Sequence, residues 1–172
     1  METPVFRAPM RSREDDVPHG AAADRALEQA LCGIGGRLTP SPASLSDALT
    51  AADATYGERI ARRLERFAAA ARGSFVWTRD TYGWFWLGRL SGAWRYDSSA
   101  PAWAVDLVHV RSCEWIPDPI PDQEVPLSVQ RAFARAGRNW QQIRAADAAP
   151  ASARVWSRHR PDAPAHVIRV VG

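Results

Sequence analysis

The chain has 172 residues and a formal net charge of +3, with 46% hydrophobic and 24% charged residues. That length suits one domain with a hydrophobic core, and the composition is that of an ordinary globular protein. No apolar run approaches the ~18 residues of a membrane span, and the N-terminus lacks the apolar segment of a secretion signal. We therefore expect a cytoplasmic protein with no membrane partner.

The charges of both signs are spread along the chain, and every basic residue is an arginine. Residues 1–72 hold ten arginines and ten acidic residues, 73–144 hold eight and seven, and 145–172 hold four and two. This distribution excludes a strongly basic arm, so a basic surface would have to be assembled by folding. The cysteines, Cys32 and Cys113, lie far apart in apolar surroundings, which favours two buried thiols over a disulfide framework or a metal site.

The first half of the chain predicts mainly helices. Residues 1–20 mix charges and prolines without a period, so we expect a disordered lead, followed by one domain over 21–172. Residues 21–31 look helical, 31–38 (LCGIGGRL) predict a buried strand, and a helix is expected to begin at Ser44 or Ser46. Apolar residues over 56–71 recur along one stripe of a 3.6-residue period: Ile60, Leu64, Phe67 and Ala71.

After Gly73 the period becomes that of strands. Residues 74–80 and 84–90 flank a turn and predict a β-hairpin with apolar residues on both faces. Residues 104–116 predict a long strand, 127–143 a short helix and a turn, 146–153 a flexible link, and 165–172 a last strand. Five or six strands with two or three packed helices predict an α+β fold around a small curved β-barrel.

Catalytic motifs are missing from the sequence. It contains no GxSxG, HExxH, P-loop or CxxC pattern. Of the four histidines, His109 alone lies on a firmly predicted element, and a single histidine on a strand is more often a hydrogen-bonded core residue than a catalytic base. We expect no enzyme, no cofactor and no metal, with a small enzyme centred on His109 as an alternative.

Tryptophan is concentrated in the predicted strands. Six of the eight fall within residues 77–115: Trp77, Trp84, Trp86, Trp94, Trp103 and Trp115. Burial in the core is the commonest use of any one of them. Six in one sheet also suit an aromatic cleft that stacks a flat base or holds a cation.

The order of these motifs resembles a known family. Residues 73–97 (GSFVWTRDTYGWFWLGRLSGAWRYD) and 106–116 (DLVHVRSCEWI) are similar to the pattern of EVE-like and McrB N-terminal-like domains of the PUA-like superfamily, and LCGIGGRL stands where that family has its first strand. The resemblance spans about residues 27–143. It implies a small barrel that binds nucleic acid through a flipped or modified base, often in phage-restriction systems.

The resemblance also implies a ligand pocket. Its residues in this chain would be Ile34, Gly35, Trp77, Trp94, Tyr96, His109, Arg111 and Trp115. A structural alternative exists for two of these residues, in which Arg111 ties the strand to a carboxylate and Trp115 plugs the barrel. Phosphate contacts are expected from surface arginines, namely Arg59, Arg63, Arg66 and Arg95.

Two functions remain open. We expect a non-catalytic module that binds nucleic acid, DNA rather than RNA, and accepts a modified or flipped base. The alternative is a subunit of a defence system that binds a partner protein and has a degenerate pocket, because Gly36 stands where the family often has tryptophan. Tryptophans packed together without a cleft would favour this alternative.

Overall fold

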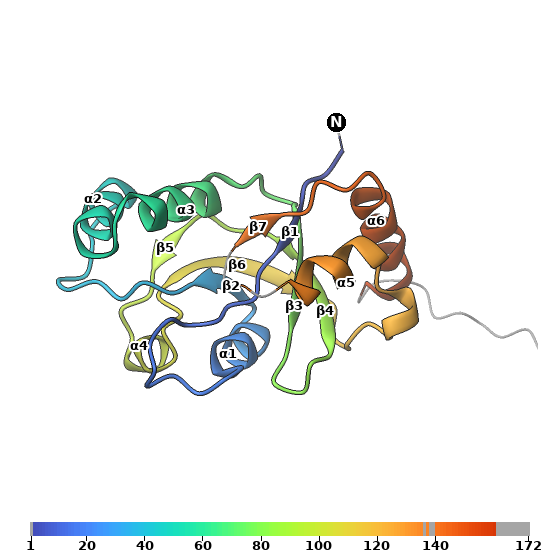
Figure 1. Ribbon diagram of the computed structural model, residues 1–172, viewed down its shortest axis with the longest axis horizontal. Helices are drawn as coiled ribbons and strands as arrows, with labels where there is room; N and C mark the ends of the chain where they lie inside the picture. Colours follow the sequence, from blue (N-terminus) through green and yellow to red (C-terminus); the bar gives the residue numbers. More distant parts are fainter. Residues whose placement is uncertain (1, 136, 138–139, 161–172) are drawn as a thin grey trace, which may run out of the picture.

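The computed structural model describes residues 2–135, 137 and 140–160, and shows a curved mixed sheet with helices around it (Figure 1). The main path of the seven-stranded sheet is β2 (Leu31–Ile34), β6 (His109–Trp115), β4 (Phe85–Leu90), β3 (Phe75–Arg79), β1 (Val5–Arg7) and β7 (Gln141–Gln142), and β5 (Arg95–Tyr96) also pairs with β6. The predicted α+β class and curved sheet are confirmed.

The described helices outnumber the two or three that we expected. They are α1 (Ala21–Gln29), α2 (Leu45–Tyr56), α3 (Glu58–Ala69), α4 (Ala100–Ala104), α5 (Leu127–Ala134) and α6 (Ala148–His159), with a short 3-10 turn η1 (Asp122–Glu124). The Ser44 side chain caps α2 by accepting a hydrogen bond from the Asp47 amide, as the sequence predicted. None of these helices combines the length and apolar character that crossing a membrane requires.

The N-terminal segment corrects one prediction. Residues 1–20 were expected to be disordered, but Val5–Arg7 form β1, parallel to β3 and antiparallel to β7. Phe6 is buried and stacks on Trp140, with ring centroids 4.5 Å apart. A three-residue strand leaves no measurable period, and its partners are distant in sequence, so local pattern could not reveal it.

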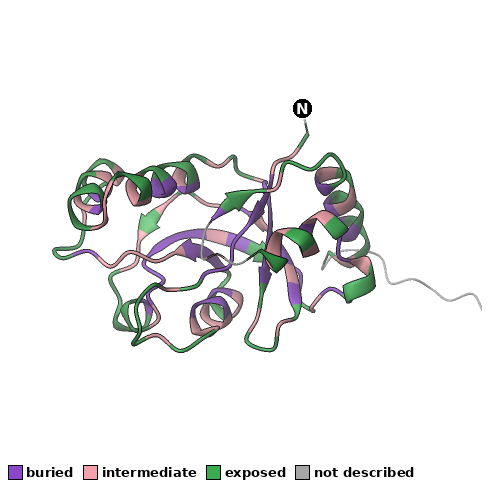
Figure 2. Ribbon diagram, in the orientation of Figure 1, coloured by how far each residue is buried: buried purple, intermediate pink, exposed green. Residues whose placement is uncertain are grey.

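The hairpin of β3 and β4 separates two hydrophobic cores. Val76 faces the core beneath α1, α2 and α3, while Phe75 and Trp77 face the core beneath α5 and α6. Figure 2 shows the buried central strands between helices whose outer faces are exposed. The expectation that both faces of the hairpin are covered is confirmed, because each face packs on its own set of helices.

The C-terminal region brings a second correction. Residues 146–153 were expected to be a flexible link, yet α6 runs from Ala148 to His159 and buries Val155 and Trp156. These apolar side chains complete the second core, which supplies the packing that a short alanine-rich helix lacks on its own. The strand predicted over 165–172 lies outside the described residues.

Candidate functional site

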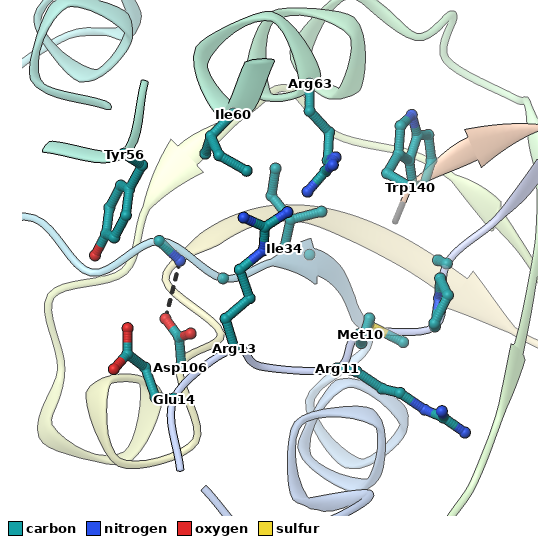
Figure 3. A pocket seen from close by; sticks show the side chains of 15 residues that line it. Met10, Arg11, Arg13, Glu14, Ile34, Tyr56, Ile60, Arg63, Asp106 and Trp140 are labelled. Carbon is teal, nitrogen blue, oxygen red and sulfur yellow. Dashed lines mark hydrogen bonds between the residues drawn. The ribbon is translucent and has the colours of Figure 1, made fainter. Parts of the chain in front are cut away.

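A cavity of about 50 Å³ opens between the N-terminal segment 8–14, the turn after β2, and helices α2 and α3 (Figure 3). Its walls are mainly apolar, with Met10, Ile34, Ile60 and Trp140 among them. Ligand pockets for whole small molecules are typically about 300–1,000 Å³. This volume therefore suits one small group of a ligand. We call this site the Arg63 cavity.

Arg63 of α3 is the central polar group of the cavity. The residue is only 8% exposed, and it forms no hydrogen bond or ion pair with any residue that the structure describes. Figure 3 shows its guanidinium and that of Arg13 approaching each other above Ile34. Burial lowers the pKa of Arg63, and the positive charges of Arg13, Arg66 and Arg59 lower it further.

An arginine stays protonated at neutral pH even when its pKa falls. A buried cation normally has a partner, because an unpaired charge away from water is costly. The neighbouring charges that shift the pKa of Arg63 are instead those of other arginines. Glu14 and Asp106 also line the cavity, but neither forms a hydrogen bond or ion pair with Arg63. The guanidinium of Arg63 is therefore left to pair with an anionic or acceptor-bearing group of a ligand.

A carboxylate holds the opposite wall of the cavity in shape. Asp106 is buried, accepts a hydrogen bond from the Gly36 amide at 2.9 Å, and accepts another from the Ser12 hydroxyl at 2.6 Å. A Cβ at Gly35 would lie 2.5 Å from an Asp106 oxygen. Gly36 has φ +124°, a conformation that favours glycine. Both glycines are thus required for this turn, and Asp106 ties it to the segment containing Ser12.

Behind that turn, three predicted ligand residues pack on one another. His109 is buried, and its Nε2 donates to the Gly36 carbonyl at 2.9 Å while its Nδ1 accepts from Trp94 Nε1 at 3.3 Å. This pair of contacts assigns the proton to Nε2. Tyr96 packs edge-on against the same ring, and its hydroxyl donates to the Leu38 carbonyl.

This packing gives His109 a structural role. Burial lowers its pKa to about 4, although the Gly36 carbonyl and Asp106 act in the opposite direction. Both ring nitrogens are occupied, so the imidazole has no free lone pair with which to act as a base. The geometry gives no support to an enzyme centred on this residue.

Three other predicted ligand residues lie away from the Arg63 cavity. Trp77 donates its indole N–H to Ser152 at 3.0 Å, and Trp115 donates to the Leu31 carbonyl at 2.8 Å, both inside the protein. The buried Arg111 donates to the Gly92 carbonyl and to the Phe67 and Ala70 carbonyls at the C-terminal end of α3. The polar atoms of all three side chains thus have hydrogen-bond partners inside the protein. Arg111 ties its strand to backbone carbonyls and not to the carboxylate that the structural alternative predicted.

The predicted set is therefore only partly brought together. Ile34, Gly35 and Arg63 line the cavity. Arg59 and Arg66 are exposed on α3, on the same helix as Arg63, and Arg95 is exposed on β5, apart from the lining residues. Within the described ranges, no three His, Cys, Asp or Glu side chains are grouped as a metal site would require.

Comparison with known proteins gives no identification. No protein-family model matches the sequence, and no curated protein matches it. The site must therefore be interpreted from its own residues.

Sequence reasoning missed the residues that come from the N-terminal segment, Met10 and Arg13, and from the far end of the chain, Trp140. One signal was present, since the apolar residues Val5, Phe6, Ala8 and Met10 occur close together in a lead that otherwise looks polar. For Trp140, no local pattern distinguishes a cavity wall from ordinary core.

Proposed function

We propose that this chain is a non-catalytic module that binds nucleic acid and holds one acceptor-bearing group of a nucleotide in the Arg63 cavity. The observation that carries the proposal is Arg63, a buried residue that lines the cavity and whose guanidinium has no acceptor within the described part of the chain. Arginine presents a planar fork of donors that matches phosphate oxygens or the acceptor edge of a base.

The surroundings of the cavity support this chemistry. Arg13 lines the cavity with Arg63, and Arg59 and Arg66 place further positive charge on the exposed part of α3. The small volume limits the guest to a phosphate or to the edge of a base. Entry of a whole flipped base requires the segment around Ser12 to move away from Asp106, because that contact closes the wall.

The resemblance to EVE-like domains supports the same proposal. It favours DNA over RNA, a modified or flipped base, and a setting in phage defence, and each of these remains a prediction. Ile34 and Gly35 are the residues that the resemblance assigns to the pocket and that line this cavity.

The test is a binding panel of labelled single-stranded and duplex DNA and RNA, with unmodified and modified bases, at low salt. Arg63→Met should weaken binding at least tenfold, and Arg66→Met, on the same helix but exposed, is the matched control. Free phosphate and free nucleosides as competitors separate a phosphate guest from a base guest. Absence of binding to every oligonucleotide would refute the proposal.

A second candidate function is binding of a partner protein. The observation that favours it is that Trp77 and Trp115 are packed in the interior, so the predicted aromatic cleft is filled by the protein itself. In the same panel, this candidate predicts no oligonucleotide affinity and no dependence on Arg63.

A further inference from the structure

A second concave site lies beside the Arg63 cavity, at the tip of the β3–β4 hairpin. This hairpin cleft has a volume of about 380 Å³, and its lining includes Arg7, Arg11, Arg79, Arg135 and Tyr82. Pro9 and Arg11 belong to both sites, so the two are contiguous. Any chain-like ligand that fills one can continue into the other.

The charge of the hairpin cleft is strongly unbalanced. Among the residues that the structure describes, four arginines line it and Asp80 is its one acidic lining residue. The carboxylate of Asp80 already accepts hydrogen bonds from the Tyr82 and Trp84 amides and from Trp86 Nε1. Its oxygens thus have partners within the hairpin, and its single negative charge is outnumbered by the four arginines. A cleft with this excess of cations concentrates anions from solution.

Arg7 shows that the cleft holds more positive charge than its walls neutralise. The residue is 4% exposed and uses one nitrogen for the Arg135 and Gly137 carbonyls, while its buried Nε has no partner in the described part of the chain. Burial lowers the pKa of Arg7, and the charges of Arg11 and Arg135 lower it further.

One exposed aromatic ring, that of Tyr82, lines this cleft, and the ring of Trp84 lies beside it. Tyr82 is 81% exposed and Trp84 is 56% exposed, and their ring centroids are 5.8 Å apart. Asp80 fixes the backbone at both residues, and Thr81 anchors the loop to Asp24 of α1 at 2.9 Å. The backbone that carries the two rings is thus fixed before any ligand arrives, which lowers the entropy cost of binding.

We infer that the hairpin cleft is a track for single-stranded nucleic acid, whose phosphates contact the arginines and whose unpaired bases stack on Tyr82 and Trp84. Every base offers a flat face for stacking, but a duplex covers those faces with its own neighbours. Exposed aromatics beside a cationic groove therefore favour a single strand. This inference rests on the proposed nucleic-acid function and adds the form of the strand and its path beside the Arg63 cavity.

The experiment measures the affinity of the full chain for a labelled oligo-dT and for the same strand within a duplex, by fluorescence anisotropy at several salt concentrations. We expect the single strand to bind more tightly. The double variant Tyr82→Ala/Trp84→Ala should lose at least about fivefold in affinity for it. Arg79→Gln should reduce the slope of log affinity against log salt by about 0.7, the value for one phosphate contact on a single strand.

Two matched controls test whether the effects are local. Trp103→Ala removes another exposed tryptophan, on α4, and Arg154→Gln removes an exposed arginine on α6. Both should leave the affinity within about twofold of the unchanged protein. All substituted side chains except that of Arg63 are at the surface, and circular dichroism confirms that each variant is folded.

The outcomes separate this inference from the proposed function. Loss of affinity in Arg63→Met without any effect of the hairpin variants would overturn the inference and support the proposed function of the Arg63 cavity. Loss in the hairpin variants alone would support the track and count against the cavity. Equal affinity for single strand and duplex, or no binding at low salt, would overturn the inference.

Discussion

Replacing Arg63 by methionine is expected to stabilise the folded protein while it weakens anion binding. Methionine keeps an unbranched apolar stem of similar reach, so contacts with Ile60 and the rest of the cavity wall can persist. The substitution removes the charge of a residue that is 8% exposed and has no acceptor among the described residues. Most core substitutions destabilise a protein, so a gain in stability is a specific consequence of this geometry.

The magnitude follows from the surroundings of the guanidinium. An unsatisfied buried polar group costs about 1–3 kcal/mol, and more when it is charged. Arg63 faces a cavity of about 50 Å³, which has room for water that partly solvates the charge. We therefore expect a gain of about 1–2 kcal/mol in the free energy of unfolding. For a chain of this size, that corresponds to a rise of about 2–8 °C in Tm.

The assay is urea denaturation of both proteins, repeated across a series of phosphate concentrations. A ligand that binds only the folded state adds about 1.4 kcal/mol for each tenfold increase above its Kd. The unchanged protein should show this dependence, and Arg63→Met should show little of it. Arg66→Met, exposed on the same helix, should change the free energy of unfolding by less than about 0.5 kcal/mol. A loss of stability in Arg63→Met together with an unaltered response to phosphate would refute the reasoning.

Three further predictions concern the structural roles assigned above. Burial lowers the pKa of His109 from 6.5 to about 4. The neutral imidazole therefore stabilises the fold above pH 6.5, and roughly 3 kcal/mol of the free energy of unfolding is lost as pH falls toward 4. Denaturation curves of His109→Gln should lack this part of the pH dependence. Arg111→Gln should cost about 2–4 kcal/mol in the same measurement, because three backbone carbonyls lose a charged donor, and an intact stability would show that the contacts with α3 are dispensable. Phe6→Ala should cost about 3–5 kcal/mol because the ring is buried against Trp140; a neutral effect would restore the view of a disordered lead.

Local pattern was enough for the elements whose partners are near in sequence. The 3.6-residue stripe of Ile60, Leu64 and Phe67 predicted α3, the capping side chain of Ser44 marked the start of α2, and apolar residues on both faces predicted a hairpin buried on both sides. Each of these signals is written within about a dozen residues, because helix and strand periods are local properties. The α+β class with a curved sheet followed from their order.

Only the tertiary structure decided which residues form the site. Arg59, Arg63 and Arg66 share one helix, and the helical period places Arg63 nearest to the apolar stripe. The period does not show that Arg63 alone of the three is buried, in a cavity that the N-terminal segment completes. The tryptophans likewise divide by long-range packing, since Trp77 is enclosed while Trp84, seven residues later, stands exposed at the hairpin tip. Burial depends on which distant segments cover a residue, and a parallel pairing such as β1 with β3 joins segments about seventy residues apart. The period of a helix or strand does not tell which distant segments will cover a residue. The lack of an acceptor for Arg63 therefore became visible only in the folded chain.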